Sequence, residues 1–463
     1  MLLTIEKLIY GGEGLARLPA DPDQDNAERR GKAVFIPFVL PEEEVDATIA
    51  ERRPGFVRAR AEKIVSPSSH RIPPDCPYFA QCGGCHYQHA DYAYQLEIKE
   101  KILRENLRRI ARFEVQGEVQ VHPSPPWNYR NRSRLQLRTH PVFTLGYFRL
   151  ASHDVLPVEQ CPISSPLINR AITVLWQLGR AGEMPEVLRE IEFFANADDS
   201  KLLVELFSAA DAHRAPMREC AEKLKSSMPE IAGVTVFRAA QNSVQEPLVT
   251  VGAGELMYKN GQSAYRVTAG SFFQTNRFLI GELIDIVTRN QSGEVALDLY
   301  AGVGLFSTAL ASNFRHVVSV ESSQTAVSDL AYNLPTNGKA IRSATGQYLS
   351  GASGKARAEA RDWLAEPRSE TKMGRATKGE LPLHLNKPDV IVVDPPRSGL
   401  GDAVARALAG VKAPQLIYVS CDPATLARDI VPLQEAGYRI GELHLVDLFP
   451  QTYHLESVVK LEL

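Results

Sequence analysis

The sequence is poor in long hydrophobic runs, in cysteine and in tryptophan. None of its apolar stretches approaches the ~18 residues that a membrane-spanning helix needs, so no membrane partner is expected. The first residues, Met1-Leu2-Leu3-Thr4-Ile5-Glu6-Lys7, lack the pattern of a signal peptide. A cytoplasmic protein is therefore predicted, and there its 6 cysteines stay reduced unless they bind metal or take part in chemistry.

The charge balance also lacks a strong excess of either sign. The net charge of −3 over 463 residues does not indicate nucleic-acid binding through overall charge. A local basic excess lies within residues 99–138, where Arg104, Arg108 and Arg112 share one face of an expected helix. Residues 129–138 then alternate like a strand with one basic face. Such a surface either follows a phosphate backbone or is simply solvated.

The chain divides into three consecutive parts that differ in their pattern of apolar and polar residues. It is expected to be a monomer. Residues 1–62 contain short β-like runs between Gly, Pro and acidic turns, which predicts a small OB-like barrel. Residues 63–265 mix helical and strand patterns, typical of an α+β domain, and begin with a cysteine cluster. Residues 266–463 alternate strands and helices, which predicts a Rossmann-like α/β domain. Residues 351–387, rich in Ala, Gly and charge, are expected to form an inserted loop.

One thiol stands at the end of an expected buried strand. The apolar run Gln415–Ser420 is followed by Cys421, and Asp422-Pro423 then ends the strand. The carboxyl ends of parallel strands form the edge at which open α/β sheets bind ligands. A free cysteine is more often a small buried hydrophobe. A chemical role for this thiol therefore depends on what else lies at the same edge.

Two glycines follow another expected strand, in Tyr300-Ala301-Gly302-Val303-Gly304, where glycine lets the backbone approach a ligand closely. A dinucleotide fingerprint would have a third glycine where Ser307 stands, so a conventional NAD pyrophosphate loop is not indicated. Glu321 ends the next strand, where an acid can accept hydrogen bonds from ribose hydroxyls. These features fit an adenosine ligand without a pyrophosphate, such as S-adenosylmethionine. A purely structural turn is the alternative.

Two further acids stand at strand ends. Asp394 closes the apolar run Val390–Val393 and begins Asp394-Pro395-Pro396-Arg397, in which the two prolines stiffen the loop that presents the carboxylate. The alternative for Asp394 is a helix cap. Glu456 directly precedes an expected strand at 457–461 and, beside a nucleophile, is a candidate base.

These segments together resemble the RNA uracil-5-methyltransferases that use S-adenosylmethionine, the group that modifies tRNA and 23S ribosomal RNA. The resemblance is carried, in family order, by residues 271–276 (Ser-Phe-Phe-Gln-Thr-Asn), 298–306, 394–397, 420–429 and 449–456. It implies that Cys421 is the nucleophile and Glu456 the base that removes a proton. The residues that it implies at the cofactor and uracil sites are Gln274, Tyr300, Gly302, Gly304, Glu321 and Asp394. The chain departs from the family at 344–347, where only Gln347 stands near the usual adenine contact.

The implied chemistry explains these residue types. C5 of uracil is a weak nucleophile, but a thiolate that adds to C6 turns the base into an enolate whose C5 can attack a sulfonium methyl group. A base must then remove the hydrogen at C5 before the cysteine can leave. The target uridine must be unstacked or flipped to reach the thiol.

The remaining cysteines of interest form a second group. Its members are Cys76, Cys82, Cys85 and Cys161. Prolines follow the first and last, as they do around iron–sulfur ligands, and the arrangement resembles the [4Fe–4S] site of the ribosomal-RNA branch, with a role in folding or RNA docking. Zinc, with or without His86 or His89, is an alternative, and so are unligated thiols. Residues 82–86 also match the c-type haem motif, but haem attachment of that kind belongs to exported proteins.

The N-terminal barrel resembles the RNA-binding TRAM domain, chiefly in Gly11-Gly12-Glu13-Gly14 and residues 34–39. A barrel combined with four clustered cysteines resembles the ribosomal-RNA enzymes more than the bacterial tRNA enzymes, which implies ribosomal RNA as the substrate. A tRNA-modifying relative with a cluster is the alternative. Two other classes are a catalytically silent iron–sulfur RNA-binding protein and a nicotinamide-dependent redox enzyme. The intact pair Cys421 and Glu456 argues against both, and the missing third glycine argues against the second.

Overall fold

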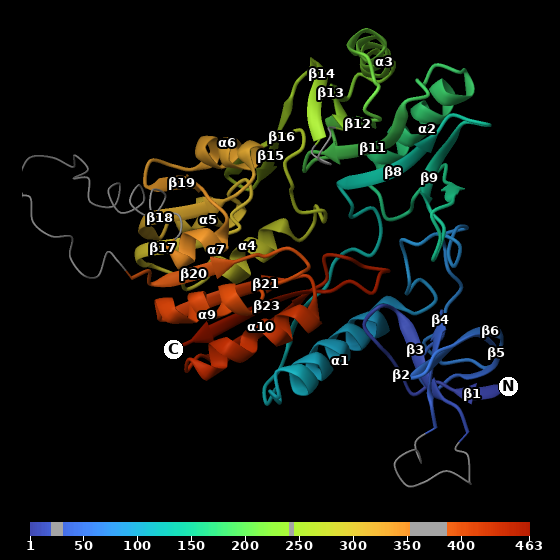
Figure 1. Cartoon of the computed structure of the whole chain (residues 1–463), viewed down its shortest axis with the longest axis vertical. Coiled ribbons are helices and arrows are strands. Elements are labelled where there is room, and N and C mark those ends of the chain that lie inside the picture. Colours follow the sequence, from blue (N-terminus) through green and yellow to red (C-terminus); the bar gives the residue numbers. More distant parts are fainter. Residues whose placement is uncertain (20–30, 240–244, 352–386) are drawn as a thin grey trace, which may run out of the picture.

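The computed structural model describes residues 1–19, 31–239, 245–351 and 387–463. Residues 352–386 of the expected insertion at 351–387 therefore lie outside the described residues. Figure 1 shows the N-terminal sheet in blue beside helix α1, the central sheet in green, and the C-terminal α/β body in orange and red.

Six short strands form the N-terminal sheet. In sheet order they are β1 Leu2–Thr4, β5 Glu44–Arg52, β6 Phe56–Ser66, β4 Ala33–Pro37, β3 Glu13–Arg17 and β2 Lys7–Leu8. Strands β1 and β2 are neighbours in the chain yet stand at opposite ends of this order, so the sheet closes into a barrel. Val34 and Ile36 of β4 point into a core of its own because alternate residues of a strand share a face. The predicted small barrel is present.

A seven-stranded sheet with two helices on one face forms the central body. In sheet order its strands are β10 Val155–Pro157, β9 Thr144–Phe148, β8 Arg132–Arg138, β11 Leu188–Ala195, β12 Leu202–Ser208, β13 Ile231–Ala239 and β14 Gln245–Gly252. Helices α2 Pro166–Arg180 and α3 Arg214–Ser227 pack into one hydrophobic core with this sheet. Helix α2 starts where it does because the Ser165 side chain accepts a hydrogen bond from the Ile168 N–H and proline occupies the first turn.

The basic face of β8 is paired with acids on neighbouring strands. Arg132 forms ion pairs with Glu192 and Glu205, and Arg134 forms one with Glu190. These pairs neutralise two arginines of the local basic excess. Arg132 and Arg134 therefore do not form a free phosphate-binding face.

An eight-stranded sheet and its helices form the C-terminal body. In sheet order the strands are β19 Gly338–Arg342, β18 Phe314–Glu321, β17 Gly293–Leu299, β20 Val390–Val393, β21 Gln415–Ser420, β23 Glu456–Glu462, β22 Arg439–Val446 and β7 Gln120–His122. The helices are α4 Ile280–Thr288, α5 Leu305–Leu310, α6 Gln324–Asn333, α7 Thr345–Ser350, α9 Asp402–Val411 and α10 Pro423–Glu435, and a hairpin of β15 Glu255–Asn260 and β16 Ser263–Thr268 lies beside them. Strands β17 to β21 run parallel, whereas β23 is antiparallel to both of its neighbours. The predicted Rossmann-like domain is confirmed.

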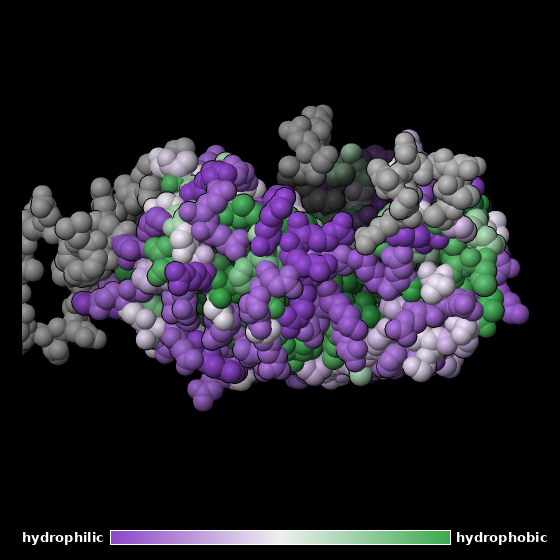
Figure 2. Space-filling model, turned by 90° about the horizontal axis from the view of Figure 1, so that it is seen from below, coloured by the Kyte–Doolittle hydropathy of each residue, from purple (hydrophilic) through white to green (hydrophobic). Residues whose placement is uncertain are grey.

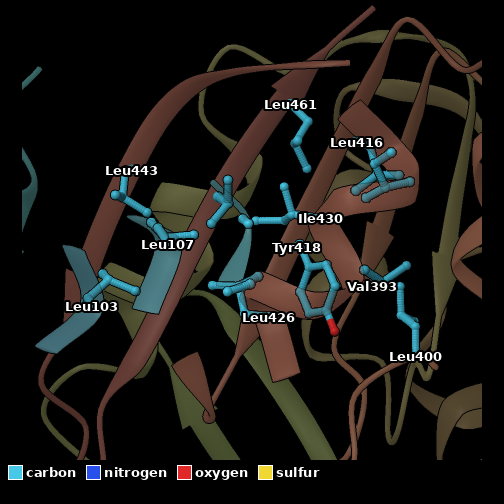
Figure 3. Close-up of a cluster of buried hydrophobic side chains, with 14 of the residues drawn as sticks. Leu103, Leu107, Val393, Leu400, Leu416, Tyr418, Leu426, Ile430, Leu443 and Leu461 are labelled. Atoms are coloured by element: carbon cyan, nitrogen blue, oxygen red, sulfur yellow. The ribbon is translucent and has the colours of Figure 1, made fainter. Parts of the chain in front are cut away.

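Strand alternation divides the C-terminal core into two layers. Ile391 and Val393 of β20 pack in the layer that holds α9, α10 and α1, whereas Val390 and Val392 belong to the layer with α4 and α5. Figure 3 shows Val393 and Tyr418 of the sheet in the first layer, with Leu426 of α10 nearby. Strands buried on both faces read as continuous apolar runs, which is why these were recognisable in the sequence.

Two elements that precede the central sheet join the C-terminal body. Helix α1 Tyr92–Ile110 places Leu103 and Leu107 in its core, as Figure 3 shows. Strand β7 extends the sheet edge, parallel to β22. The barrel contributes Leu8 and Leu40 to the same core. The domain boundaries at residues 62 and 265 stay a prediction, while the packing is continuous across the first of them.

The surface differs from these cores. The face in Figure 2 is hydrophilic over most of its area, with hydrophobic side chains in small separate patches. None of the helices in the described ranges combines the length and apolar character that a membrane crossing needs. Apolar side chains are concentrated inside the bodies described above.

Candidate functional site

The carboxyl edge of the parallel strands gathers the predicted residues. Asp394 follows β20 and Cys421 follows the adjacent β21. Glu456 is the first residue of β23, and because β23 runs antiparallel to β21, its start lies at the same edge. Ser457 pairs with Ser420, so the thiol and the carboxyl each stand one residue beyond this pair. The strand register therefore makes them neighbours.

Burial sets the charge state of these groups. It raises the pKa of the Cys421 thiol to about 12, with the carboxyls of Glu456 and Asp394 as further causes. Burial and then the Asp394 charge raise the pKa of Glu456 well above its usual range. Burial and then the Asp298 charge raise the pKa of Asp394 to about 7. The Arg397 guanidinium lowers the pKa of both Cys421 and Glu456. At neutral pH the thiol keeps its proton, so a thiolate needs a nearby proton acceptor or a cationic ligand.

Gln274 joins this group from the segment before α4. Its Nε2 donates to Asp394 Oδ2 at 3.3 Å. Asn276 anchors the same segment, donating from Nδ2 to Ser124 Oγ at 2.9 Å and to Leu448 O at 3.1 Å. Asp394 serves as a hydrogen-bond acceptor here and not as a helix cap, because α9, the next helix of the described chain, is capped by Gly401.

The loop after β17 is built from left-handed residues. Tyr300, Gly302 and Gly304 have φ of 62°, 55° and 94°. The φ of 94° at Gly304 would strain any other residue, and a Cβ there would also lie 2.8 Å from Leu330 Cδ1. A Cβ on Gly302 would meet no atom of the described residues within 4 Å. The Gly302 side of the loop therefore faces open space, as a ligand cradle must.

Glu321 holds this loop to the end of β18. Its Oε2 accepts from the Gly302 N–H at 3.0 Å and its Oε1 from the Ser323 N–H at 2.7 Å. Oε1 also accepts from the Ser322 N–H at 2.6 Å and the Ser322 hydroxyl at 3.2 Å. Oε2 accepts only from the Gly302 N–H among the described residues, so its second lone pair can accept from a ligand hydroxyl. Ser307 stands where a dinucleotide loop has glycine, and its hydroxyl donates to Asp298. The missing third glycine is thus replaced by a buried side chain that braces the end of β17.

The loop at residues 447–455, called the base loop, leads into Glu456 and is held by buried polar contacts. Lys99 Nζ of α1 donates to Asp447 Oδ1 at 2.6 Å. Gln95 Nε2 donates to Gln451 Oε1, and Gln95 Oε1 accepts from the Gln451 N–H, both at 3.0 Å. Helix α1 therefore positions the segment that carries the candidate base.

Lys99→Met is expected to lower the free energy of unfolding by about 3–5 kcal/mol, because it leaves the Asp447 carboxylate buried without its cation. Both side chains are 0% exposed. Denaturant unfolding measures the loss, and the double variant Lys99→Met with Asp447→Leu should recover most of it. Lys101→Met is the matched control on the same helix, since its side chain is 70% exposed. A loss as small as that of Lys101→Met would contradict the prediction.

The predicted metal ligands lie around one pocket. Its lining includes Cys76, Cys82, Cys85 and Cys161. Burial raises the pKa of Cys82 to about 11 and that of Cys85 to about 12, so a bound metal must displace protons. Within the described ranges, no group of three or more His, Cys, Asp or Glu side chains is arranged to hold one metal ion. The sixth cysteine, Cys220, is buried in the central core.

A buried cation faces the same pocket. Arg130 lines it, and among the described residues its Nε has no hydrogen-bond partner. Its charge lowers the pKa of Cys82 and Cys85, so it favours an anionic, thiolate-ligated group. The two histidines of the zinc alternative are not among the lining residues: the His86 ring packs on another aromatic ring, and His89 Nε2 lies 3.3 Å from a barrel carbonyl. A site that uses either histidine, including the haem motif, therefore has no support in the geometry.

Sequence reasoning missed two groups at this edge. Arg397 acts on Cys421 and Glu456, as described above, and its Nη2 lies 3.4 Å from His454 Nε2. Its position directly after the two prolines was the feature of the sequence that could have indicated it. Tyr10 comes from the barrel, and its hydroxyl donates to Cys421 O at 3.2 Å. Its turn carries no pattern that links it to a residue 411 positions later.

Comparison with known proteins gives two family matches. Residues 91–463 match the family described as tRNA (Uracil-5-)-methyltransferase, and residues 1–61 match the TRAM domain. An uncharacterized RNA methyltransferase of Aquifex aeolicus is 30% identical over 99% of this chain and 98% of its own. The 23S rRNA (uracil(1939)-C(5))-methyltransferase RlmD of Pseudomonas savastanoi pv. phaseolicola is 30% identical over 100% of this chain and 93% of its own. The predicted TRAM domain is confirmed.

A solved structure shares the fold. The tRNA (uracil-54, C5)-methyltransferase of Pyrococcus abyssi, in complex with S-adenosyl-L-homocysteine, matches with a TM-score of 0.70 and 24% identity. The match covers 100% of both chains. The order of bodies along the chain is therefore that of a known enzyme fold.

Proposed function

This chain belongs to the tRNA (uracil-5-)-methyltransferase family, and on that premise we propose that it methylates C5 of a uridine in 23S ribosomal RNA, with S-adenosylmethionine as the methyl donor. The family consists of RNA uracil-5-methyltransferases, so the enzyme class follows from membership. The observation that carries the mechanism is the register of β21 and β23, which makes Cys421 and Glu456 neighbours. Ribosomal RNA is supported by the relatives named as 23S rRNA enzymes.

The cofactor fits the loop and acids at the sheet edge. The open side of Gly302 and the second lone pair of Glu321 Oε2 suit an adenosine with its ribose hydroxyls. The residues that would hold the cofactor are Gln274, Tyr300, Gly302, Gly304, Glu321 and Asp394. When bound, the cofactor supplies an electrophilic methyl group and a positive charge. Asp394, with its pKa near 7, accepts a hydrogen bond from Gln274 and is available as a counter-charge.

Cys421 and Glu456 divide the chemistry between them. The Cys421 thiol first loses its proton to solvent, which leaves Glu456 free for the later step. The thiolate sulfur then forms a bond to C6, and the electrons of the C5–C6 double bond move into an enolate that makes C5 nucleophilic. Once C5 has gained the methyl group, Glu456 accepts the remaining C5 proton. The electrons of that C–H bond restore the double bond and release the Cys421 thiolate. Arg397 favours the ionised form of both residues throughout.

We further propose that the four pocket cysteines hold a [4Fe–4S] cluster that serves folding or RNA docking. Four cysteine side chains line one pocket, and four cysteine thiolates are the ligand set of a [4Fe–4S] cluster. The buried Arg130 beside them offsets the negative charge of a thiolate-ligated cluster.

Anaerobically purified protein is expected to show a broad absorption near ~400 nm and to lose it in Cys85→Ser, because one of four ligands is then missing. Cys220→Ser, which removes a thiol outside the pocket, should keep the band. Iron and sulfide assays accompany the spectrum. Colourless protein with one zinc per chain would overturn the cluster and favour the alternative metal.

The substrate is tested by mapping 5-methyluridine in 23S rRNA and in tRNA from a strain that lacks this gene. One ribosomal position should lose its methyl group, regain it with the wild-type gene, and stay unmodified with Cys421→Ala. Loss of 5-methyluridine from tRNA alone would instead support the second candidate function, methylation of a tRNA uridine, which the name of the matched family favours. Full modification of both RNAs would contradict the proposal and leave a catalytically silent RNA-binding protein.

A further inference from the structure

The barrel turn between β2 and β3 reaches the sheet edge at Cys421. In this turn the Ile9 N–H donates to Glu13 O at 3.0 Å and the Gly12 N–H to Ile9 O at 3.1 Å, which leaves Tyr10 at the tip. The Tyr10 hydroxyl donates to the backbone carbonyl of Cys421 at 3.2 Å. Burial and the nearby Asp422 carboxylate raise the pKa of Tyr10, so the hydroxyl keeps the proton that it donates.

The same tyrosine touches the base loop. Its ring meets the Tyr453 ring edge to face, with centroids 5.4 Å apart and planes at 90°. Tyr453 lies three residues before Glu456 and also contacts the His86 ring at 4.6 Å. Tyr10 is therefore in contact with both segments that carry the reacting groups.

The turn is seated closely. Gly12 has φ of 87°, and a Cβ added there would lie 3.0 Å from His86 Cβ, so a side chain at this position would push the turn away. Leu8, two residues before Tyr10, is 4% exposed and belongs to the core of the C-terminal body. Lys7 and Glu105 of α1 form an ion pair beside it. These contacts hold the turn that carries Tyr10 in place against the C-terminal body.

We propose that Tyr10 is a positioning residue for uracil methylation, through which the N-terminal barrel sets the geometry of the Cys421 nucleophile; this inference rests on the proposed function. The hydrogen bond restrains the peptide group that follows the Cys421 Cα, and with it the direction of the thiol. Small displacements of a nucleophile cost much of the rate, because the reacting atoms must approach within about 3–3.5 Å. The barrel that binds RNA is, on this account, also part of the catalytic centre.

The test compares Tyr10→Phe with the wild type in the full chain, with transcribed 23S rRNA fragments and S-adenosylmethionine. The variant keeps the ring contact and loses only the hydroxyl. We expect kcat to fall about five- to tenfold, which corresponds to the loss of one neutral hydrogen bond. KM for both substrates and the thermal midpoint of unfolding should be unchanged. The kcat of Tyr10→Ala should be lower still, because this variant also loses the ring contact with Tyr453. Tyr332→Phe, which alters a 60% exposed ring on α6, is the control and should match the wild type.

A second readout does not need the natural reaction. The rate at which iodoacetamide alkylates Cys421, followed by mass spectrometry of its peptide, should change in Tyr10→Phe and stay unchanged in Tyr332→Phe. Wild-type kcat and wild-type alkylation in Tyr10→Phe would overturn the inference, as would a lowered thermal midpoint with kcat preserved. A wild-type protein that methylates no uridine would instead defeat the proposed function, and the alkylation rate would still decide the role of Tyr10.

Discussion

Cys421→Ser is expected to lower kcat/KM for methyl transfer by about 10⁴-fold or more, since enzymes that lose their nucleophile fall by that order. A serine hydroxyl is almost never ionised near neutral pH, so it cannot add to C6 at a useful rate. Transfer of labelled methyl groups to RNA measures the loss. RNA that contains 5-fluorouridine offers a second measurement, because the C5 fluorine cannot leave as a proton and the wild-type covalent adduct persists.

The matched control for this change is Cys220→Ser. It alters a thiol in the central core, where the residue is only 6% exposed. The folded Cys220→Ser protein should retain methyltransferase activity, even if the substitution lowers its stability. Binding of S-adenosylmethionine to Cys421→Ser should equal that of the wild type, because the thiol is not among the proposed cofactor residues. A Cys421→Ser protein that still methylates, or still forms an adduct, would place the nucleophile elsewhere.

Glu456→Gln is expected to lower turnover by about 10²–10⁴-fold while a covalent protein–RNA complex accumulates. Glutamine keeps the size of the side chain and cannot accept the C5 proton, so the cysteine stays bonded to C6. The complex should survive a denaturing gel, and its mass should equal protein plus RNA plus one methyl group, less the hydrogen lost from the thiol. No fluorinated RNA is needed for this trap.

Glu462→Gln is the control, because it changes an exposed carboxylate at the far end of the same strand. It should turn over normally and leave no complex on the gel. Normal turnover of Glu456→Gln without a complex would contradict the assignment of the base. An inactive Glu456→Gln that forms no complex would assign Glu456 to a step before methyl transfer.

The strands were predictable because burial on both faces leaves a local signature. Val390–Val393 and Gln415–Ser420 are continuous apolar runs that end in a polar turn, and both are strands with these bounds. Residues at the ends of parallel strands then share one edge, which brings Asp394 and Cys421 together. The direction of β23 has no such signature. Its antiparallel register is what brings Glu456 to the thiol, and only the structure contains it.

Contacts between distant segments were not predictable for the same reason. Lys99 and Asp447 form a buried pair although 348 positions separate them, and each residue taken alone looks like an ordinary surface charge. Tyr10 stands in a turn whose glycines indicate only a change of direction. The basic alternation of β8 was recognised, but the acids that neutralise Arg132 lie on other strands. Local patterns report which face is buried and not which partner covers it.

The place of β23 has a consequence for synthesis of the chain. This strand lies between β21 and β22 although it comes after both in the sequence. A nascent chain that has reached β22 can pair this strand only with the short edge strand β7, because β22 is joined to β21 through β23. The strand that closes this gap also starts with Glu456. Completion of the sheet and arrival of the base are therefore one event in the synthesis of the chain.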